Sequence, residues 1–216
     1  MRLDRDSFLL YAVTDRAWTG RQSLYEQVES ALSGGITLLQ LREKNMSDEA
    51  FLEEAVRIKK LCDDHQVPLI INDRVDVALK CGAAGVHLGQ EDGNVREVRE
   101  KVGDRLLIGV SAHNVKEALL AQEQGADYLG VGAVFGSSTK TDAHPLEHAE
   151  LRKISHAVSI PVVAIGGITR ENVTLLKGTG ISGAALISAI FAAHDIEKEC
   201  RELKEILRDI SLDNRK

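Results

Sequence analysis

Aromatic residues, prolines and cysteines are all scarce in this chain, and each shortage narrows what it can be. Aromatic side chains make up 4% of the 216 residues, and 3 prolines stand against 18 glycines. This composition favours an α/β fold with many short turns over an all-β sandwich. Cys62, Cys81 and Cys200 are widely scattered and form no CxxC or zinc-binding spacing. They predict free thiols in a reducing cytoplasm.

Excess positive charge and long hydrophobic runs are also absent. The formal net charge is −6, so we expect neither nucleic acid nor an anionic membrane as a partner. Residues 1–7 are rich in charged side chains and contain no long apolar run, so we expect neither a signal peptide nor a membrane span there. An anionic ligand would therefore need a local basic cluster or a metal ion.

Short apolar runs alternate with amphipathic stretches along the whole chain. The runs are rich in Val, Ile and Leu, as expected of parallel strands buried on both faces. The expected strands are residues 8–13, 37–41, 68–71, 85–88, 106–110, 128–132, 161–165 and 183–187. Helical patterns lie between them, and the last helix is expected from about residue 189 to 210.

Eight strands alternating with helices predict a single (β/α)8 TIM barrel. We expect one domain over residues 1–216, with the barrel at about 8–210 and a short charged tail after 210. A doubly wound open sheet is the alternative fold. It usually carries a glycine-rich first crossover, and residues 14–20 contain no GxGxxG.

Two carboxylates, Asp73 and Asp92, follow neighbouring expected strands. Each by itself also fits a cap of the helix that follows it. In a barrel, however, the carboxyl ends of all strands open on the same face. Two carboxylates meeting there, beside the basic residues Arg42 and Lys44, predict a Mg²⁺ site.

Other polar residues gather at the same strand ends. Arg42 offers a planar fork of donors and Lys44 a compact charge, which together suit a diphosphate. His87 is expected to point into the barrel as a packed, hydrogen-bonded histidine rather than as a ligand. After the fifth strand, we favour Ser111 over His113 as a ligand contact.

Small residues follow the last three strands. Hydroxyl groups beside Lys140 in the loop 135–142 predict an anion-binding loop. Gly166 and Gly167 would let backbone N–H groups approach a phosphate, and Ile187 and Ser188 would open the final helix. Two anion sites and a Mg²⁺ site facing one cavity suggest the joining of a phosphorylated molecule to a diphosphate-bearing one, with diphosphate leaving.

In combination, these motifs resemble those of the thiamine phosphate synthase family over roughly residues 8–193. The motifs are residues 40–44, 72–73, 89–92, 111–113, 139–140 and 165–168. The resemblance implies a TIM barrel and a cytoplasmic transferase that requires Mg²⁺. Such an enzyme condenses hydroxymethylpyrimidine diphosphate with a thiazole phosphate, or its carboxylate form, to give thiamine phosphate and diphosphate. Diphosphate is expected to leave first, through a pyrimidine carbocation.

The resemblance also implies roles for particular residues. Asp73 and Asp92 would bind Mg²⁺, while Lys140, Arg42 and Ser111 would act in catalysis. The residues that would contact the pyrimidine diphosphate are Gln40, Leu41, Arg42, Glu43, Lys44, Asn72, Ser111 and Lys140. Contacts to the thiazole phosphate would come from Ser137, Ser138, Thr139, Gly167, Ile187 and Ser188.

One departure and two alternatives accompany this resemblance. The family often has a Pro-Thr pair where this chain has Gly136 and Ser137, which bears on loop rigidity and thiazole-phosphate affinity. The first alternative is a thiazole tautomerase-like isomerase, which tends to lack the acidic metal residues and carries a histidine where this chain has Ala133. The second is a non-catalytic protein that binds a phosphate ligand. The sequence sets no oligomeric state.

Overall fold

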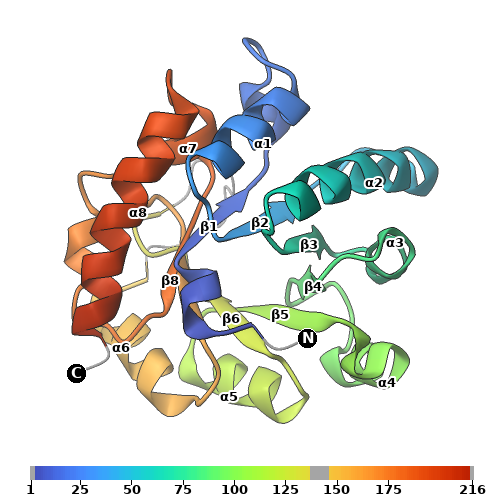
Figure 1. Cartoon of the computed structure of the whole chain (residues 1–216). Helices are drawn as coiled ribbons and strands as arrows, with labels where there is room; N and C mark the ends of the chain where they lie inside the picture. The colour runs from blue at the N-terminus through green and yellow to red at the C-terminus, as the bar shows by residue number, and fades with distance from the viewer. Residues whose placement is uncertain (1–2, 137–145, 215–216) are drawn as a thin grey trace.

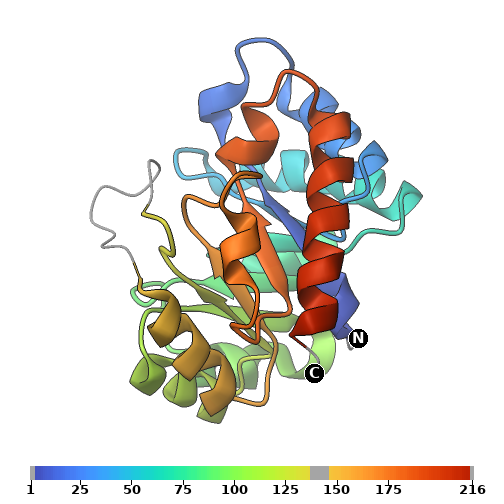
Figure 2. The same cartoon turned by 90° about the vertical axis from the view of Figure 1, so that its left-hand side faces the viewer.

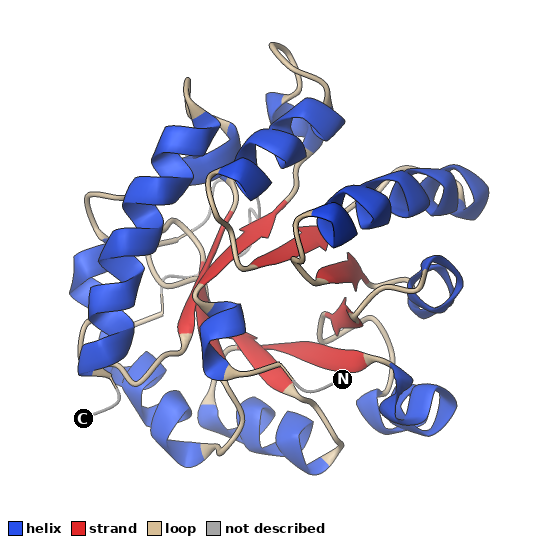
Figure 3. Ribbon diagram, viewed as in Figure 1, coloured by secondary structure: helices blue, strands red, loops and turns tan. Residues whose placement is uncertain are grey.

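The structure, a computed structural model, describes residues 3–136 and 146–214. Within these residues, eight parallel strands close into a barrel in sequence order, and β8 pairs back with β1. Figure 3 shows the ring of strands inside a ring of helices. The strands are β1 Leu10–Val13, β2 Leu38–Leu41, β3 Leu69–Asn72, β4 Gly85–Leu88, β5 Leu107–Ala112, β6 Tyr128–Val131, β7 Val162–Ile165 and β8 Gly183–Leu186. The predicted TIM barrel is confirmed, and the domain bounds 1–216 stay a prediction.

Polar caps begin most of the helices. Ser23 and Glu26 form a reciprocal capping box at α1, and Asn94 and Asn114 accept backbone N–H groups at α4 and α5. The α-helices are α1 Leu24–Ser33, α2 Asp48–Asp64, α3 Val75–Cys81, α4 Val95–Val102, α5 Val115–Glu123, α6 His148–Ala157, α7 Ser188–Phe191 and α8 Ile196–Asp213. Short 3-10 helices lie at η1 Arg5–Phe8, η2 Arg16–Trp18, η3 Gly103–Arg105 and η4 Val173–Leu176.

Two expected elements differ in the structure. The expected continuous final helix is wrong, because α7 ends at Phe191 and α8 starts only after Asp195, whose side chain caps it through Lys198 N. Figure 2 shows the turn between the two helices. The first strand begins at Leu10, because residues 5–8 form η1. In Figure 1, η1 lies in front of the ring of strands.

Alternation along the strands divides the apolar residues into two cores. One lies between strands and helices, and the other fills the barrel interior. The interior core consists of Phe8, Tyr11, Val13, Leu38, Ile70, Tyr128, Val163 and Ala185. Phe8 comes from η1, so this helix contributes a side chain to the interior. In the part of the chain that the structure describes, no helix is long and apolar enough to cross a membrane.

Replacing Gly109 with alanine should destabilise the barrel. Gly109 pairs in register with Tyr128, and a Cβ at Gly109 would overlap the Tyr128 ring. Overpacking of this kind costs about 1–3 kcal/mol. Chemical denaturation should show that loss for Gly109→Ala, whereas Gly20→Ala, whose Cβ meets no described residue within 4 Å, should change the free energy of unfolding little. Equal stability of the two variants would contradict this view of the interior.

Candidate active site

A pocket of about 130 Å³ opens at the carboxyl ends of the strands. Its walls come from strand ends around the ring. Among the residues predicted to bind substrate, those that line it are Gln40, Arg42, Asn72, Ser111, Gly167, Ile187 and Ser188. The structure therefore brings together side chains that lie far apart in the sequence, on the face that carries active sites in barrel enzymes.

The loop after β1 holds the loop after β2 in place. Thr14 is fully buried, and its hydroxyl accepts a hydrogen bond from Arg42 N at 3.0 Å. Asp15 Oδ2 accepts from the Arg42 guanidinium at 3.3 Å. These contacts direct Arg42 into the pocket wall.

Leu41 and Glu43 were predicted to contact substrate, but the structure does not bring their side chains into the pocket. Leu41 is fully buried in the core between strands and helices. Glu43 turns away to pair with Arg16 at 2.8 Å, and Arg16 also pairs with Glu54. Burial raises the pKa of the Glu43 carboxyl, and Arg16 opposes that rise. Glu43 thus supports the loop, and substrate contact by these two residues stays a prediction.

Neither Asp73 nor Asp92 caps a helix, so that alternative is wrong. Helix α3 has Arg74 at its N-cap, without a side-chain cap, and helix α4 is capped by Asn94. Asp73 adopts a left-handed backbone with φ of 62° directly after β3. Asp92 Oδ2 accepts from Gly89 N at 2.8 Å and so folds its own loop back towards β4.

The two carboxylates contact each other. Burial is the largest cause that raises the pKa of Asp73, and the hydrogen bond and negative charge of Asp92 raise it further. Lys44 Nζ, 3.5 Å from Asp73 Oδ2, partly offsets the rise. Among the described residues, no three His, Cys, Asp or Glu side chains gather as a metal site. A carboxylate pair nevertheless fits Mg²⁺, which is often held by one or two carboxylates together with phosphate oxygens of a substrate.

Gly166 and Gly167 form a turn that packs the loop after β6 against β7. Both have positive φ, 101° and 64°. Val134 N donates to Ile165 O and Phe135 N donates to Gly166 O, each at 3.0 Å. A Cβ at Gly167 would lie 2.7 Å from Phe135 O. The glycines are therefore needed for close backbone packing, besides any approach to a phosphate.

Four predicted contacts of the loop after β6 lie outside the described residues, namely Ser137, Ser138, Thr139 and Lys140. Lys44 is described, and its side chain is about half exposed beside Asp73. His113 lines the pocket, but its Nδ1 lies 2.9 Å from Glu117 Oε2. The preference for Ser111 over His113 stays a prediction.

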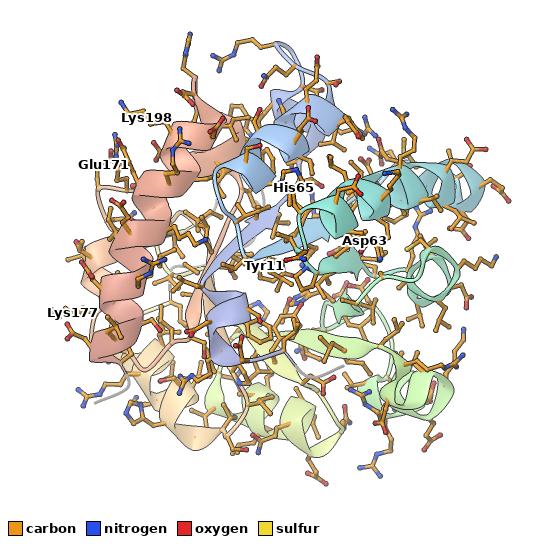
Figure 4. All side chains as sticks on the ribbon, in the orientation of Figure 1. Tyr11, Asp63, His65, Glu171, Lys177 and Lys198 are labelled. Atoms are coloured by element: carbon orange, nitrogen blue, oxygen red, sulfur yellow. The ribbon has the colours of Figure 1, made fainter. Side chains whose placement is uncertain are left out.

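His87 points into the barrel, as expected, and it contacts Tyr128, which together with Tyr11 was not predicted from the sequence. Its Nδ1 lies 3.1 Å from Tyr128 Oη and its Nε2 lies 3.1 Å from Ser111 Oγ. Tyr128 Oη lies 2.9 Å from Tyr11 Oη. Alternation along β1 and β6 was the signal available, because it sends Tyr11 and Tyr128 to the same side as the pocket. Figure 4 shows Tyr11 inside the ring of strands, whereas Lys177 and Lys198 lie at the periphery.

A closed (β/α)8 barrel with a polar pocket at the carboxyl ends of its strands has the architecture of a barrel enzyme. The sequence model of the thiamine monophosphate synthase family matches residues 10–190. The chain belongs to this family, and the prediction of a transferase of thiamine biosynthesis is confirmed.

Similar proteins cover nearly the whole chain. Thiamine-phosphate synthase of Clostridium beijerinckii is 51% identical over 197 residues, which is 91% of this chain and 94% of that protein. The Ruminiclostridium cellulolyticum thiamine-phosphate synthase is 50% identical over 92% of this chain and 95% of its own length. Among solved structures, thiamine phosphate pyrophosphorylase from Pyrococcus furiosus superposes with a TM-score of 0.88 at 40% identity, covering 95% of this chain and 98% of that one.

Replacing Gly167 with alanine should disrupt the turn after β7. Gly136→Ala is a matched control, because Gly136 also has positive φ, 81°, but a Cβ there meets no atom of the described residues within 4 Å. Backbone strain alone costs roughly 1–3 kcal/mol, and Gly167→Ala adds the clash with two carbonyl oxygens. We expect Gly167→Ala to lower the free energy of unfolding clearly more than Gly136→Ala. The reverse order in urea denaturation would rule out the packing role.

Proposed function

We propose that this protein is a thiamine-phosphate synthase that joins hydroxymethylpyrimidine diphosphate to a thiazole phosphate or its carboxylate form. One observation carries the proposal: the paired carboxylates Asp73 and Asp92 stand beside Lys44, next to a pocket lined by Arg42. This pairing of cation site and basic side chains suits a diphosphate leaving group. The relatives named as thiamine-phosphate synthases support the choice of substrates.

The residues divide into two groups around the cavity. Gln40, Asn72 and Ser111 line this cavity and would bind the edge of the pyrimidine ring, since each carries hydrogen-bonding groups. Arg42 and Lys44 would hold the diphosphate, and Lys140 would join them. Backbone N–H groups near Gly167 and Ser188 would hold the phosphate of the thiazole, on the side of the strands β7 and β8 that binds phosphate in many barrels.

The chemistry needs charge stabilisation and alignment. Asp73 and Asp92 would hold Mg²⁺, which when bound supplies positive charge to the diphosphate oxygens. Arg42 and Lys44 neutralise the charge that develops as the carbon–oxygen bond breaks and the electron pair leaves with diphosphate. The thiazole nitrogen then donates its lone pair to the pyrimidine carbocation. Holding both substrates in one cavity supplies the entropic part of the rate.

The isomerase alternative is less well supported. Ala133 lines the pocket where that paralogue carries a histidine, and the acidic pair that it tends to lack is present here. The expected cytoplasmic location and the exclusion of nucleic-acid and membrane partners stay predictions.

The direct test supplies the purified protein with both substrates and Mg²⁺. We expect thiamine phosphate and diphosphate to form in equal amounts. Pyrimidine monophosphate in place of the diphosphate should give no product, because it lacks the leaving group that the basic residues stabilise. A folded protein that forms no thiamine phosphate under these conditions would refute the synthase assignment.

Asp73→Asn should separate stability from activity. Because the pKa of Asp73 is raised in the folded state, its ionised form destabilises the metal-free protein as pH rises through that pKa. Asparagine removes this charge and tolerates the left-handed backbone at this position. We expect the metal-free variant to be at least as stable as the wild type at neutral pH. Its turnover should fall by about a hundredfold or more, and Mg²⁺ should no longer raise its melting temperature.

The matched control is Asp76→Asn on α3, which removes an exposed ion pair between Asp76 and Lys101 of α4. It should keep both turnover and the response to Mg²⁺. If Asp73→Asn instead keeps full turnover, or still gains stability from Mg²⁺ as the wild type does, the metal assignment is wrong.

A further inference from the structure

A continuous chain of hydrogen bonds crosses the barrel interior beneath the pocket. It begins at Gln40, whose Nε2 donates to Tyr11 Oη at 2.7 Å, and Tyr11 Oη lies 2.9 Å from Tyr128 Oη. From Tyr128 it continues to His87 Nδ1 and from His87 Nε2 to Ser111 Oγ, each at 3.1 Å. The five residues come from strands β2, β1, β6, β4 and β5. Both ends of the chain, Gln40 and Ser111, line the pocket.

The barrel interior is shaped to hold this chain. Gly109 leaves the space that the Tyr128 ring fills, and a Cβ at Gly130 would come within 3.0 Å of the His87 ring. The Tyr128 ring packs against Phe8 and Tyr11, at centroid distances of 4.9 Å and 6.1 Å. Rings fixed in this way leave the hydroxyl groups little freedom to choose other partners.

The donor at Gln40 determines which group donates in each hydrogen bond of this series. Gln40 Nε2 is a donor, so the Tyr11 oxygen accepts there. A fully buried hydroxyl left without an acceptor would cost about 1–3 kcal/mol. The acceptor that the described residues provide for the Tyr11 proton is Tyr128 Oη. The Tyr128 proton then goes to His87 Nδ1.

This direction of donation determines which His87 nitrogen carries the proton and where the Ser111 hydroxyl points. An imidazole that accepts at Nδ1 carries its proton on Nε2 and donates it to Ser111 Oγ. The Ser111 proton is then directed away from His87. Burial raises the pKa of both tyrosine hydroxyls, Tyr11 and Tyr128, which keeps the two phenols neutral donors.

We propose that Tyr128 is a positioning residue that fixes the Nε2–H tautomer of His87 and thereby makes Ser111 a hydrogen-bond donor towards the pocket, and that Tyr11 positions Gln40 at the opposite end of the hydrogen-bond chain. At the other end, the Gln40 carbonyl is the acceptor that this residue presents. An acceptor and a donor that line the same pocket match an aminopyrimidine, whose amino group donates and whose ring nitrogen accepts. The inference rests on the proposed function for its substrate, but the tautomer itself does not depend on that function.

The first test reads the tautomer in the ligand-free protein. Nitrogen NMR of isotope-labelled histidine at fixed neutral pH should show His87 protonated on Nε2 in the wild type. Tyr128→Phe removes the donor to Nδ1 and should shift His87 away from that tautomer. Tyr25→Phe is the matched control, since Tyr25 lies on α1 beside Arg57, outside the pocket. A wild-type His87 protonated on Nδ1 would overturn the proposal.

The second test reads recognition of the substrate. Tyr128→Phe should raise KM for the pyrimidine diphosphate about five- to tenfold, as expected for one misdirected hydrogen bond, and leave KM for the thiazole phosphate unchanged. Tyr11→Phe should raise the same KM but keep the Nε2–H tautomer, because Tyr128 still donates to His87. This second variant keeps the proposal testable if Tyr128→Phe fails to fold. Unchanged KM in a folded variant would overturn it.

Failure of the proposed function and failure of the positioning role give different results. A wild-type protein that makes no thiamine phosphate refutes the proposed function, and the NMR measurement still decides the direction of the chain. A wild-type protein that is active but shows no tautomer shift on Tyr128→Phe refutes the positioning role alone.

Discussion

The closed ring of parallel strands is the constraint on which the rest of this protein depends. Each strand can send only every second side chain inward, and the interior is narrow. Large rings such as Tyr128 fit only because Gly109 stands opposite. At the level of the pocket, the same inward rows supply Gln40, Asn72 and Ser111. The floor of the site is therefore the upper layer of the barrel core, and the packing that stabilises the fold also orients the polar groups.

Electrostatics at the pocket rim works against the stability of the empty protein. Asp73 and Asp92 are held close together, and the partial burial of Asp73 makes their mutual repulsion more costly. Lys44 offsets part of this repulsion but remains about half exposed. If Mg²⁺ and an anionic substrate bind beside these carboxylates, as proposed, they would relieve this repulsion.

The loop after β1 shows how support residues differ from contact residues. Thr14 and Asp15 hold the backbone and the guanidinium of Arg42, and Arg16 holds the carboxylate of Glu43. Glu43 therefore stabilises the shape of its loop. Arg42, Glu43 and Lys44 form a run of three charged residues in the sequence. In the structure, Arg42 lines the pocket, Glu43 supports the loop and Lys44 is about half exposed.

Local patterns in the sequence determined the strands, the barrel and the strand ends at which Arg42, Asn72 and Asp73 appear, because alternation and glycine turns depend on neighbouring residues alone. Only the tertiary structure decided which partner each side chain found. It turned Glu43 to Arg16, freed Asp73 and Asp92 from capping, divided the expected last helix at residues 192–195 and joined Tyr11 to Tyr128. These partners lie on elements that are separated in the sequence, so their pairing depends on register and on closure of the ring, which no short stretch of sequence encodes.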